Sequence, residues 1–264
     1  MTLITLGPEG TFSHDLALKM DTEIILVPTI STVFSKVLMT GIPGLVPLEN
    51  SEAGGVIATM DGLMQHPVFI CEEHYLKIHH TLASDTSPDR IQVIFAHPQS
   101  HDQCSKYIDE LGIPVIHTES NAASAHAQKN RPGSAAIISK TLADSLGIPV
   151  LAENIENNQD NVTRFVVIGR EPSQKNNPEK CSIIVDPGEN RAGLLYDLLS
   201  PFKETDVNLT RIESRPSKRC MGNYVFFIDL QCEGSWQDAV KRISAITRVK
   251  HLGCYRLAGE DPCR

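Results

Sequence analysis

The chain has 264 residues, of which 41% are hydrophobic and 21% are charged, and its formal net charge is −8 at pH 7. This composition supplies enough apolar side chains for a sizeable core, which excludes a generally disordered chain and excludes collagen-like or coiled-coil fibres. The negative charge disfavours binding to nucleic acid or to a membrane surface, because both rely on basic protein surface. We therefore expect no nucleic-acid and no membrane partner.

The lack of a recognisable targeting signal and the spacing of the cysteines both favour a reducing compartment. No run reaches the ~18 apolar residues that a membrane helix needs, and the start MTLITLGPEGTF lacks the features of a signal peptide. We expect a cytoplasmic protein with reduced, mostly buried thiols, since no C-x-x-C pair suggests a disulfide framework or a zinc ribbon. The cysteines are Cys71, Cys104, Cys181, Cys220, Cys232, Cys254 and Cys263.

Short β-like runs alternate with helical patterns over residues 1–170, which predicts an α/β domain with crossover connections. The run 68–82 is rich in β formers and long enough to pass from one lobe to another, so a two-lobed domain with a cleft is the simplest arrangement. The expected strands are 3–6, 23–27, 44–48, 91–96, 114–117, 135–138 and 164–169, and the expected helices are 13–20, 30–39, 56–65, 100–111, 120–129 and 139–146.

A linker is expected at residues 171–180, a polar stretch with two prolines and no large apolar side chain. The domain after it, residues 181–264, shows the order strand, helix, strand, strand, helix, strand. This βαββαβ order is typical of a ferredoxin-like fold. Its expected elements are 182–186, 191–204, 207–214, 223–231, 235–247 and 251–258.

The segment GPEGTFS at residues 7–13 leads from a predicted strand into a predicted helix. Its glycines allow close approach of a ligand, and the amides at the helix start, with the Thr11 and Ser13 hydroxyls, can hold a carboxylate or phosphate. The alternative is a tight strand–helix turn capped by Ser13.

The segment VPLENSEAGGV at residues 46–56 also follows a strand with polar residues. Ligands usually bind at the carboxyl ends of strands in open α/β sheets, which makes Glu49, Asn50 and Ser51 candidates. The alternative is a helix start capped by Asn50 or Ser51, with Glu49 in an ion pair.

Two more segments carry polar groups near strands. HPQSHDQC at residues 97–104 opens a helix, but Pro98 argues against a shared helical face for its two histidines, so we predict no metal site. NVTRF at residues 161–165 offers a hydroxyl donor, Thr163, and a permanent cation, Arg164. In the alternative, Thr163 is a β-former and Arg164 an outward charge.

Together, GPEGTFS, VPLENSEAGGV, HPQ…QC and NVTRF, in this order and spacing, resemble the prephenate dehydratases. AGLLYDLL at 192–199 and IESRP at 212–216 resemble the glycine-rich and ESRP segments of their regulatory ACT domain. The resemblance implies a two-lobed, periplasmic-binding-protein-like (type II) catalytic domain followed by a ferredoxin-like βαββαβ ACT domain. It also implies decarboxylating dehydration of prephenate to phenylpyruvate in L-phenylalanine biosynthesis, a hydro-lyase reaction without a cofactor.

Roles for individual residues follow from the same resemblance. Thr163 would donate a hydrogen bond to the leaving hydroxyl, and Glu49 is a candidate proton source if burial raises its pKa. Ala96 stands where many members of the family have serine, so either that hydroxyl is dispensable or Ser100 or a water replaces it. The expected catalytic residues are Thr163, Glu49, Asn50, Ser51 and Gln103, and the expected substrate-binding residues are Gly10, Thr11, Phe12, Arg164 and Phe165.

The ACT resemblance implies inhibition by L-phenylalanine bound between two ACT domains, and hence a homodimer or homotetramer. Leu194 stands where alanine is commoner and would narrow that pocket; alternatively it is a core residue of the helix. The expected phenylalanine-binding residues are Gly193, Leu194, Leu195, Asn208, Leu209, Glu213, Ser214, Arg215 and Pro216.

Two other functions stay open from the sequence. One is an arogenate dehydratase, whose substrate differs by an amino group on the side chain. The other is a noncatalytic amino-acid sensor that signals to a partner through its ACT domain, a function that needs no Thr163 hydroxyl.

Overall fold

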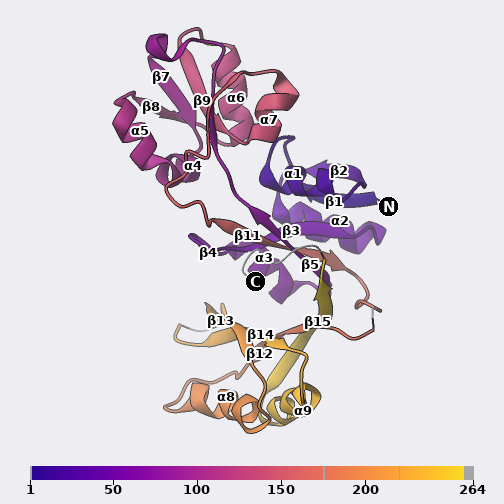
Figure 1. The fold of residues 1–264 in the computed structure, drawn as a ribbon. Coiled ribbons are helices and arrows are strands. Elements are labelled where there is room, and N and C mark those ends of the chain that lie inside the picture. Colours follow the sequence, from indigo (N-terminus) through magenta and orange to yellow (C-terminus); the bar gives the residue numbers. More distant parts are fainter. Residues whose placement is uncertain (1, 175, 220, 259–264) are drawn as a thin grey trace.

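The computed structural model describes residues 2–174, 176–219 and 221–258. Three bodies are stacked in Figure 1. Residues 2–77 and 162–169 form lobe 1, in the middle, and residues 81–153 form lobe 2 on one side of it. Residues 180–257 form a C-terminal domain on the other side.

Lobe 1 contains a sheet in the order β5-β11-β3-β1-β2, in which β1 is parallel to both neighbours and β11 is antiparallel to β3 and β5. The short strand β4 pairs with β3 to make a small hairpin. The strands are β1 (Thr2–Leu6), β2 (Glu23–Val27), β3 (Gly44–Asn50), β4 (Gly54–Gly55), β5 (Phe69–Lys77) and β11 (Val162–Gly169), and the helices are α1 (Phe12–Lys19), α2 (Ile30–Thr40) and α3 (Ile57–Gln65).

Helix α2 illustrates how the sequence builds the core of lobe 1. Thr29 caps its first turn by accepting from the Thr32 amide, and Gly41 ends it in the left-handed conformation. Phe34 is fully buried on the inner face, and Gly62 of α3 lies so close to its ring that a Cβ there would come within 2.4 Å. Close packing of α2 and α3 therefore depends on this glycine.

Lobe 2 contains a second sheet in the order β10-β6-β9-β7-β8. Residues 78–80 and 154–161 cross between the lobes, so the run 68–82 does pass from lobe 1 to lobe 2 as predicted. The elements are β6 (Thr81–Ala83), η1 (Pro88–Arg90), β7 (Val93–Ala96), α4 (Pro98–Gln103), α5 (Ser105–Leu111), β8 (Val115–His117), α6 (Asn121–Lys129), β9 (Ser134–Ile138), α7 (Lys140–Leu146) and β10 (Val150–Glu153).

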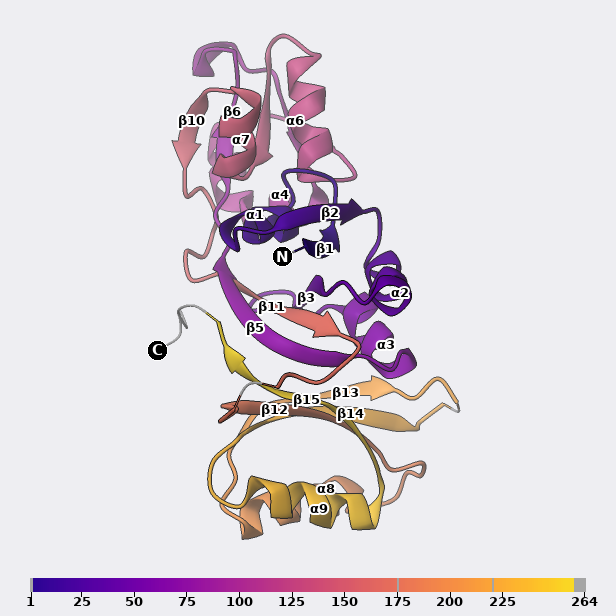
Figure 2. The ribbon, with the colours of Figure 1, turned by 90° about the vertical axis from the view of Figure 1, so that its right-hand side faces the viewer.

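The C-terminal domain has the predicted βαββαβ order, with strands arranged β13-β14-β12-β15. Figure 2 shows α8 and α9 on one face of this sheet and lobe 1 against the other face. The elements are β12 (Lys180–Asp186), α8 (Leu194–Glu204), β13 (Leu209–Pro216), β14 (Tyr224–Gln231), α9 (Trp236–Ile246) and β15 (Arg248–Leu257).

The C-terminal domain is joined to lobe 1 by more than the expected linker. Strand β15 pairs in parallel with β5, placing Arg256 opposite Glu72, and this makes one 10-stranded sheet. Sequence periodicity does not predict this pairing, because the two strands lie far apart in the chain.

Three expectations differ in detail from the structure. The helix predicted at 100–111 is interrupted at Cys104, whose ψ of 15° is non-helical, and it forms two helices, α4 and α5. The prediction of reduced thiols is wrong for Cys181 and Cys254, which form a disulfide between the neighbouring strands β12 and β15. Their separation of 73 residues hides this pairing in the sequence. Cys220 and Cys263 lie outside the described residues.

Within the described part of the chain, no helix combines the length and the apolar character needed to cross a bilayer.

Candidate active site

Strands β3 and β11 bring together two of the predicted catalytic residues. Thr163 lies opposite Asn50 in the antiparallel ladder, and the Asn50 amide donates a hydrogen bond of 2.9 Å to the Thr163 hydroxyl oxygen. The same amide donates to the Asn161 side-chain oxygen at 2.6 Å. Asn50 and Thr163 are each 8% exposed, so these hydrogen bonds form in a largely dehydrated place.

The orientation of the Asn50 amide is set by the turn that follows it. Its oxygen accepts from the backbone amides of Glu52 and Ala53, at 3.0 and 2.9 Å, so its nitrogen must face Thr163. Because the Thr163 oxygen accepts this hydrogen bond, its own hydrogen is available for donation to another group. Ser51 supports the turn by accepting from the Val162 amide at 3.0 Å.

Lobe 2 contributes Gln103, the last residue of α4. Its side-chain oxygen accepts from His80 Nε2 at 2.9 Å, and its backbone oxygen accepts from the Asn157 amide at 2.6 Å. His80 and Asn157 belong to the two segments that cross between the lobes. Asn161, on the second of these segments, accepts from the Ile78 amide through its backbone oxygen, and Ile78 lies two residues before His80 in the chain. We call the cluster of Asn50, Asn161, Thr163, His80 and Gln103 the interlobe site.

His80 was not among the predicted site residues. It is fully buried, burial lowers the pKa of its imidazole, and the neutral ring therefore donates through Nε2. The ring also packs edge-to-face on Phe12, with centroids 5.5 Å apart. The charge of Glu52 acts on both His80 and Cys104, which places this lobe 1 carboxylate toward lobe 2. The available signal in the sequence was the adjacent pair His79–His80 in an extended segment, where one of two neighbouring side chains faces inward. In the structure the buried one is His80.

The GPEGTFS loop lies between the lobes. Thr11, and not Ser13, caps α1: its hydroxyl accepts from the His14 amide and donates to the Leu6 carbonyl. The Gly10 amide donates to His14 Nδ1 at 3.1 Å. Gly10 has a φ of +80° and lies against Leu142 of lobe 2, where a Cβ would come within 2.3 Å, so the loop needs glycine at this contact.

A cavity of about 220 Å³ lies between α1 and the start of α7. Phe12, Asp15 and Ser139 are among its lining residues, whereas Thr163, Asn50 and Gln103 are not. Burial raises the pKa of Asp15, and a hydrogen bond from Ser139 opposes that shift. The cavity therefore flanks the interlobe site.

Glu49, Arg164 and Phe165 do not join the interlobe site. Because side chains alternate along a strand, Glu49 and Arg164 point to the other face of the sheet, toward the C-terminal domain. Phe165 is 1% exposed and packs in the core of lobe 1.

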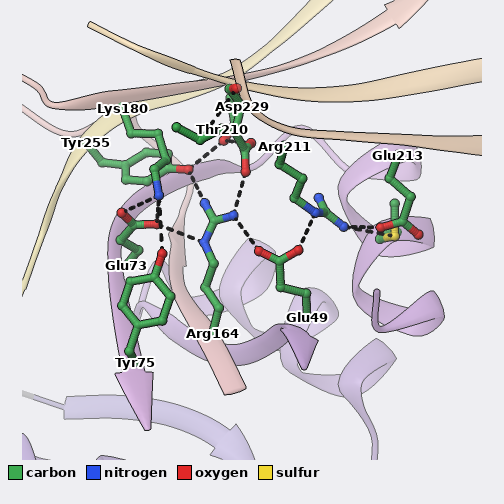
Figure 3. Close-up of polar contacts among 12 residues, drawn as sticks. Glu49, Glu73, Tyr75, Arg164, Lys180, Thr210, Arg211, Glu213, Asp229 and Tyr255 are labelled. Atoms are coloured by element: carbon green, nitrogen blue, oxygen red, sulfur yellow. Dashed lines mark hydrogen bonds and ion pairs between the residues drawn. The ribbon is translucent and has the colours of Figure 1, made fainter. Parts of the chain in front are cut away.

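Arg164 lies at the centre of a buried ionic network, drawn in Figure 3. It is 3% exposed and contacts the carboxylates of Glu73, Glu49 and Asp229 at 2.8, 3.0 and 2.5 Å. The Tyr255 hydroxyl accepts from it at 2.8 Å. Although burial opposes charge, Arg164 holds the pKa of Asp229 below its ordinary value, so both groups are ionised. The cation is fully engaged by protein carboxylates.

The network continues into the C-terminal domain on both sides. Lys180 lies 2.8 Å from the Glu73 carboxylate, and the guanidinium of Arg211 lies 2.5 Å from the second oxygen of Glu49. Arg211 also contacts Glu213. Sequence reasoning identified only part of this cluster, since its members come from seven strands of two domains.

The residues expected to bind phenylalanine near Gly193 lie in different environments. Gly193 is the left-handed N-cap of α8, and the next residue, Leu194, is buried in the core of the C-terminal domain. Leu195 is exposed, as is Asn208, whose side-chain amide donates to Gln231 at 3.1 Å. Leu209 packs against the same core as Leu194.

The ESRP segment is divided between two faces of β13. Ser214 and Pro216 are exposed, whereas Glu213 and Arg215 are half-buried against lobe 1. Arg215 lies 3.6 Å from Asp61 of α3. The structure therefore does not bring all four residues to one surface.

Ala96 is fully buried in lobe 2, and the Ser100 hydroxyl donates to Asn121 at 2.8 Å. In the described residues no group of three or more histidine, cysteine or acidic side chains could hold a metal ion.

The fold is that of a two-lobed, type II periplasmic-binding-protein-like domain, with the predicted polar residues of both lobes at their junction and a ferredoxin-like domain at its end. Residues 3–173 match the prephenate dehydratase family, and residues 183–248 match the ACT domain family. The chain thus belongs to the prephenate dehydratase family and carries an ACT domain, which confirms the fold class and the resemblance predicted from its motifs.

Individual relatives support the same conclusion. The chain is 38% identical over 235 residues to the prephenate dehydratase of Methanocaldococcus jannaschii, covering 85% of this chain and 86% of the relative. It is 42% identical over 254 residues to the bifunctional chorismate mutase/prephenate dehydratase of Stutzerimonas stutzeri, covering 93% of this chain and 68% of that one. The structure of an Arthrobacter aurescens prephenate dehydratase in complex with L-Phe superposes with a TM-score of 0.88, at 28% identity, over 97% of this chain and 90% of that chain.

Proposed function

We propose that this protein converts prephenate to phenylpyruvate at the interlobe site and that L-phenylalanine inhibits it through the ACT domain. The observation that carries the proposal is the hydrogen bond from the Asn50 amide to the Thr163 hydroxyl, within a chain of the prephenate dehydratase family. That hydrogen bond leaves the Thr163 hydrogen free for the substrate.

The reaction breaks two bonds of the substrate ring. The electron pair of the bond to the departing carboxylate moves into the ring, CO2 leaves, and the ring hydroxyl departs from the opposite carbon as the ring becomes aromatic. The hydroxyl leaves as water once it gains a proton. The enzyme therefore has to donate to the departing oxygen and to leave the departing carboxylate poorly solvated.

Thr163 is the group that we assign to the departing oxygen. A threonine hydroxyl does not ionise near neutral pH, so it acts as an oriented hydrogen-bond donor, and the proton itself comes from water. Orientation is the contribution of Asn50, which occupies the acceptor side of the same hydroxyl. Asn161 and Gln103 supply further neutral polar contacts.

The neutral character of these side chains suits decarboxylation. A nearby cation would stabilise the carboxylate and oppose its loss, and Arg164, one residue from Thr163, is turned away and held by three carboxylates. We assign the pyruvyl carboxylate to the start of α1, where the amides of Phe12 and Ser13 and the helix dipole favour an anion.

Phenylalanine control is supported by the ACT match and by the L-Phe complex of the Arthrobacter aurescens relative. In this chain, β13 is the edge strand of the ACT sheet, and Ile212 on it and Leu195 on α8 are exposed. An open edge with apolar side chains favours pairing with a second copy, so we propose a homodimer or homotetramer in which phenylalanine binds beside these residues.

The test is turnover of prephenate by the purified protein, followed by ultraviolet absorbance of phenylpyruvate. We expect product without added metal or cofactor, and slower turnover with added phenylalanine. Arogenate in a parallel assay, with phenylalanine as the measured product, distinguishes an arogenate dehydratase. Binding of either compound without turnover, measured by calorimetry, would instead identify the noncatalytic sensor.

A further inference from the structure

Strand β13 of the ACT domain carries two rows of side chains with different partners. Its burial alternates along the whole strand: Arg211, Glu213 and Arg215 are half-buried, whereas Ile212 and Ser214 are exposed. Figure 3 shows Arg211 and Glu213 reaching toward lobe 1. One strand thus presents one row of side chains to lobe 1 and the other row to solvent.

The inward row contacts the hairpin that contains Asn50. Arg211 lies between two carboxylates, those of Glu49 on β3 and Glu213 on its own strand, and its side chain is 8% exposed. Removing the cation would leave the Glu49 and Glu213 carboxylates close together without the guanidinium that they share, which is unfavourable because like charges repel.

Glu213 packs directly on the second strand of the hairpin. A Cβ added to Gly55 of β4 would come within 2.4 Å of the Glu213 carboxylate, so that carboxylate lies on the Gly55 backbone. Gly55 pairs with Glu49, and Gly54 pairs with Asn50. The ACT domain therefore touches both strands of the hairpin.

The hairpin in turn orients the catalytic pair. Its turn, residues 51–53, is closed by the Asn50 side-chain oxygen, and the Asn50 nitrogen donates to Thr163. A shift of the hairpin would move the Asn50 nitrogen relative to β11, and a misplacement of about 1 Å in such a group can cost on the order of 100-fold in rate.

We infer that Arg211 and Glu213 are positioning residues of the active site, so that the ACT domain holds the Asn50–Thr163 pair in its working geometry through the β3–β4 hairpin. The inference rests on the proposed function for its kinetic consequence only. Its structural consequence, that the hairpin is held from the ACT side, stands independently of which substrate is turned over.

The test compares Arg211→Met with Arg242→Met in the full-length protein. Arg242 also lies in the ACT domain, but it pairs on the surface with Glu204 and Asp238 and is a matched control. We expect Arg211→Met to lower kcat for prephenate about tenfold with KM within about twofold, a loss of ~1.4 kcal/mol in the chemical step. Arg211→Lys, which can pair with one carboxylate, should restore part of kcat.

Hydrogen–deuterium exchange of the hairpin provides a readout that does not depend on activity. Amides of residues 50–56 should exchange faster in Arg211→Met than in Arg242→Met, while the exchange of α9 stays the same. Trp236, the single tryptophan, packs against the ACT core, and its fluorescence checks that the domain is folded. If Arg211→Met does not fold, Glu213→Gln keeps the packing on Gly55 without the charge and takes its place.

Equal kcat and equal exchange in Arg211→Met and Arg242→Met would overturn the inference while leaving the proposed function intact. Wild-type protein that does not turn over prephenate would instead remove the proposed function. In that case faster exchange of residues 50–56 in Arg211→Met would still support the structural inference, and unchanged exchange would overturn it.

Discussion

Asn50 and Thr163 face the junction of the two lobes, whereas their chain neighbours Glu49 and Arg164 face the ACT domain, although all four lie on the same pair of strands. The first face is built from amides, a hydroxyl and the Glu52 carboxylate, which accepts from the Asn161 side-chain amide at 3.2 Å. The second is ionic, with Arg164 contacting three carboxylates. Alternation along β3 and β11 therefore turns the buried Arg164 cation away from the proposed site, although Arg164 follows Thr163 directly in the chain.

The ionic face should matter first for stability. Replacing Arg164 with methionine leaves Glu73, Asp229 and Glu49 without their shared cation, and removing one partner of a buried ion pair costs ~3–5 kcal/mol. Urea unfolding followed by Trp236 fluorescence and by circular dichroism measures the loss. A free energy of unfolding equal to that of the wild type would mean that the network does not stabilise the fold.

The face toward the lobe junction should matter for rate. Asn50→Asp keeps the shape and the oxygen that closes the turn but replaces the donor facing Thr163 with an acceptor. The Thr163 hydrogen would then be held by the new carboxylate and lost to the substrate, so we expect kcat to fall about 10–100-fold, as for a charged hydrogen bond of ~1.5–3 kcal/mol. Unchanged turnover would show that the direction of this hydrogen bond is irrelevant.

Because of His80, the stability of the folded protein should depend on pH. Burial lowers the pKa of His80 in the folded protein, so below its unfolded pKa of ~6.5 the unfolded chain binds a proton that the folded protein refuses. The free energy of unfolding should therefore be highest above pH ~6.5 and should decrease below it, by up to ~1.4 kcal/mol per pH unit from His80.

The matched variant is His80→Gln, which retains a donor toward Gln103 and does not titrate. Urea unfolding of both proteins at pH ~7 and pH ~5.5 isolates the His80 contribution, because His97, whose pKa burial also lowers, is present in both. A wild-type protein that loses no more stability than His80→Gln on acidification would contradict a buried neutral imidazole.

Removing an exposed ion pair should change the stability least, in contrast to removing the buried cation of Arg164. Lys140 and Glu153 lie 2.5 Å apart with about half of each side chain exposed. Solvent screens such a pair, so Lys140→Met should leave the urea midpoint unchanged within error. A clear loss of stability would show that charge–charge contacts in this protein matter irrespective of burial.

Local pattern in the sequence was sufficient for most of the fold. Strand 23–27 coincides with β2, and the βαββαβ order of residues 180–257 was predicted from alternation and helical periodicity alone. The sequence did not predict the pairing of β15 with β5 or the disulfide between Cys181 and Cys254. Both join segments whose proximity depends on the packing of whole domains.

The site divides in the same way. Thr163 and Asn50 were expected together and share a hydrogen bond, whereas Gln103 bonds to His80 and Asn157 on the segments that cross between the lobes. Glu49 and Arg164 share the same motifs but lie on the opposite face, since a motif specifies neighbours in the chain and the pleat specifies which side each one faces. Asp229, Arg211 and Tyr255 come from the other domain and carry no local signal.

The most direct test of the account is prephenate turnover by Thr163→Ala and Thr163→Ser beside the wild type, with unfolding curves for each. We predict that alanine lowers kcat by about 10²–10⁴-fold, the range for loss of a positioned donor, while serine keeps most of the activity and both variants unfold like the wild type. Full activity in Thr163→Ala, with an intact fold, would contradict the role of this hydroxyl and the mechanism built on it.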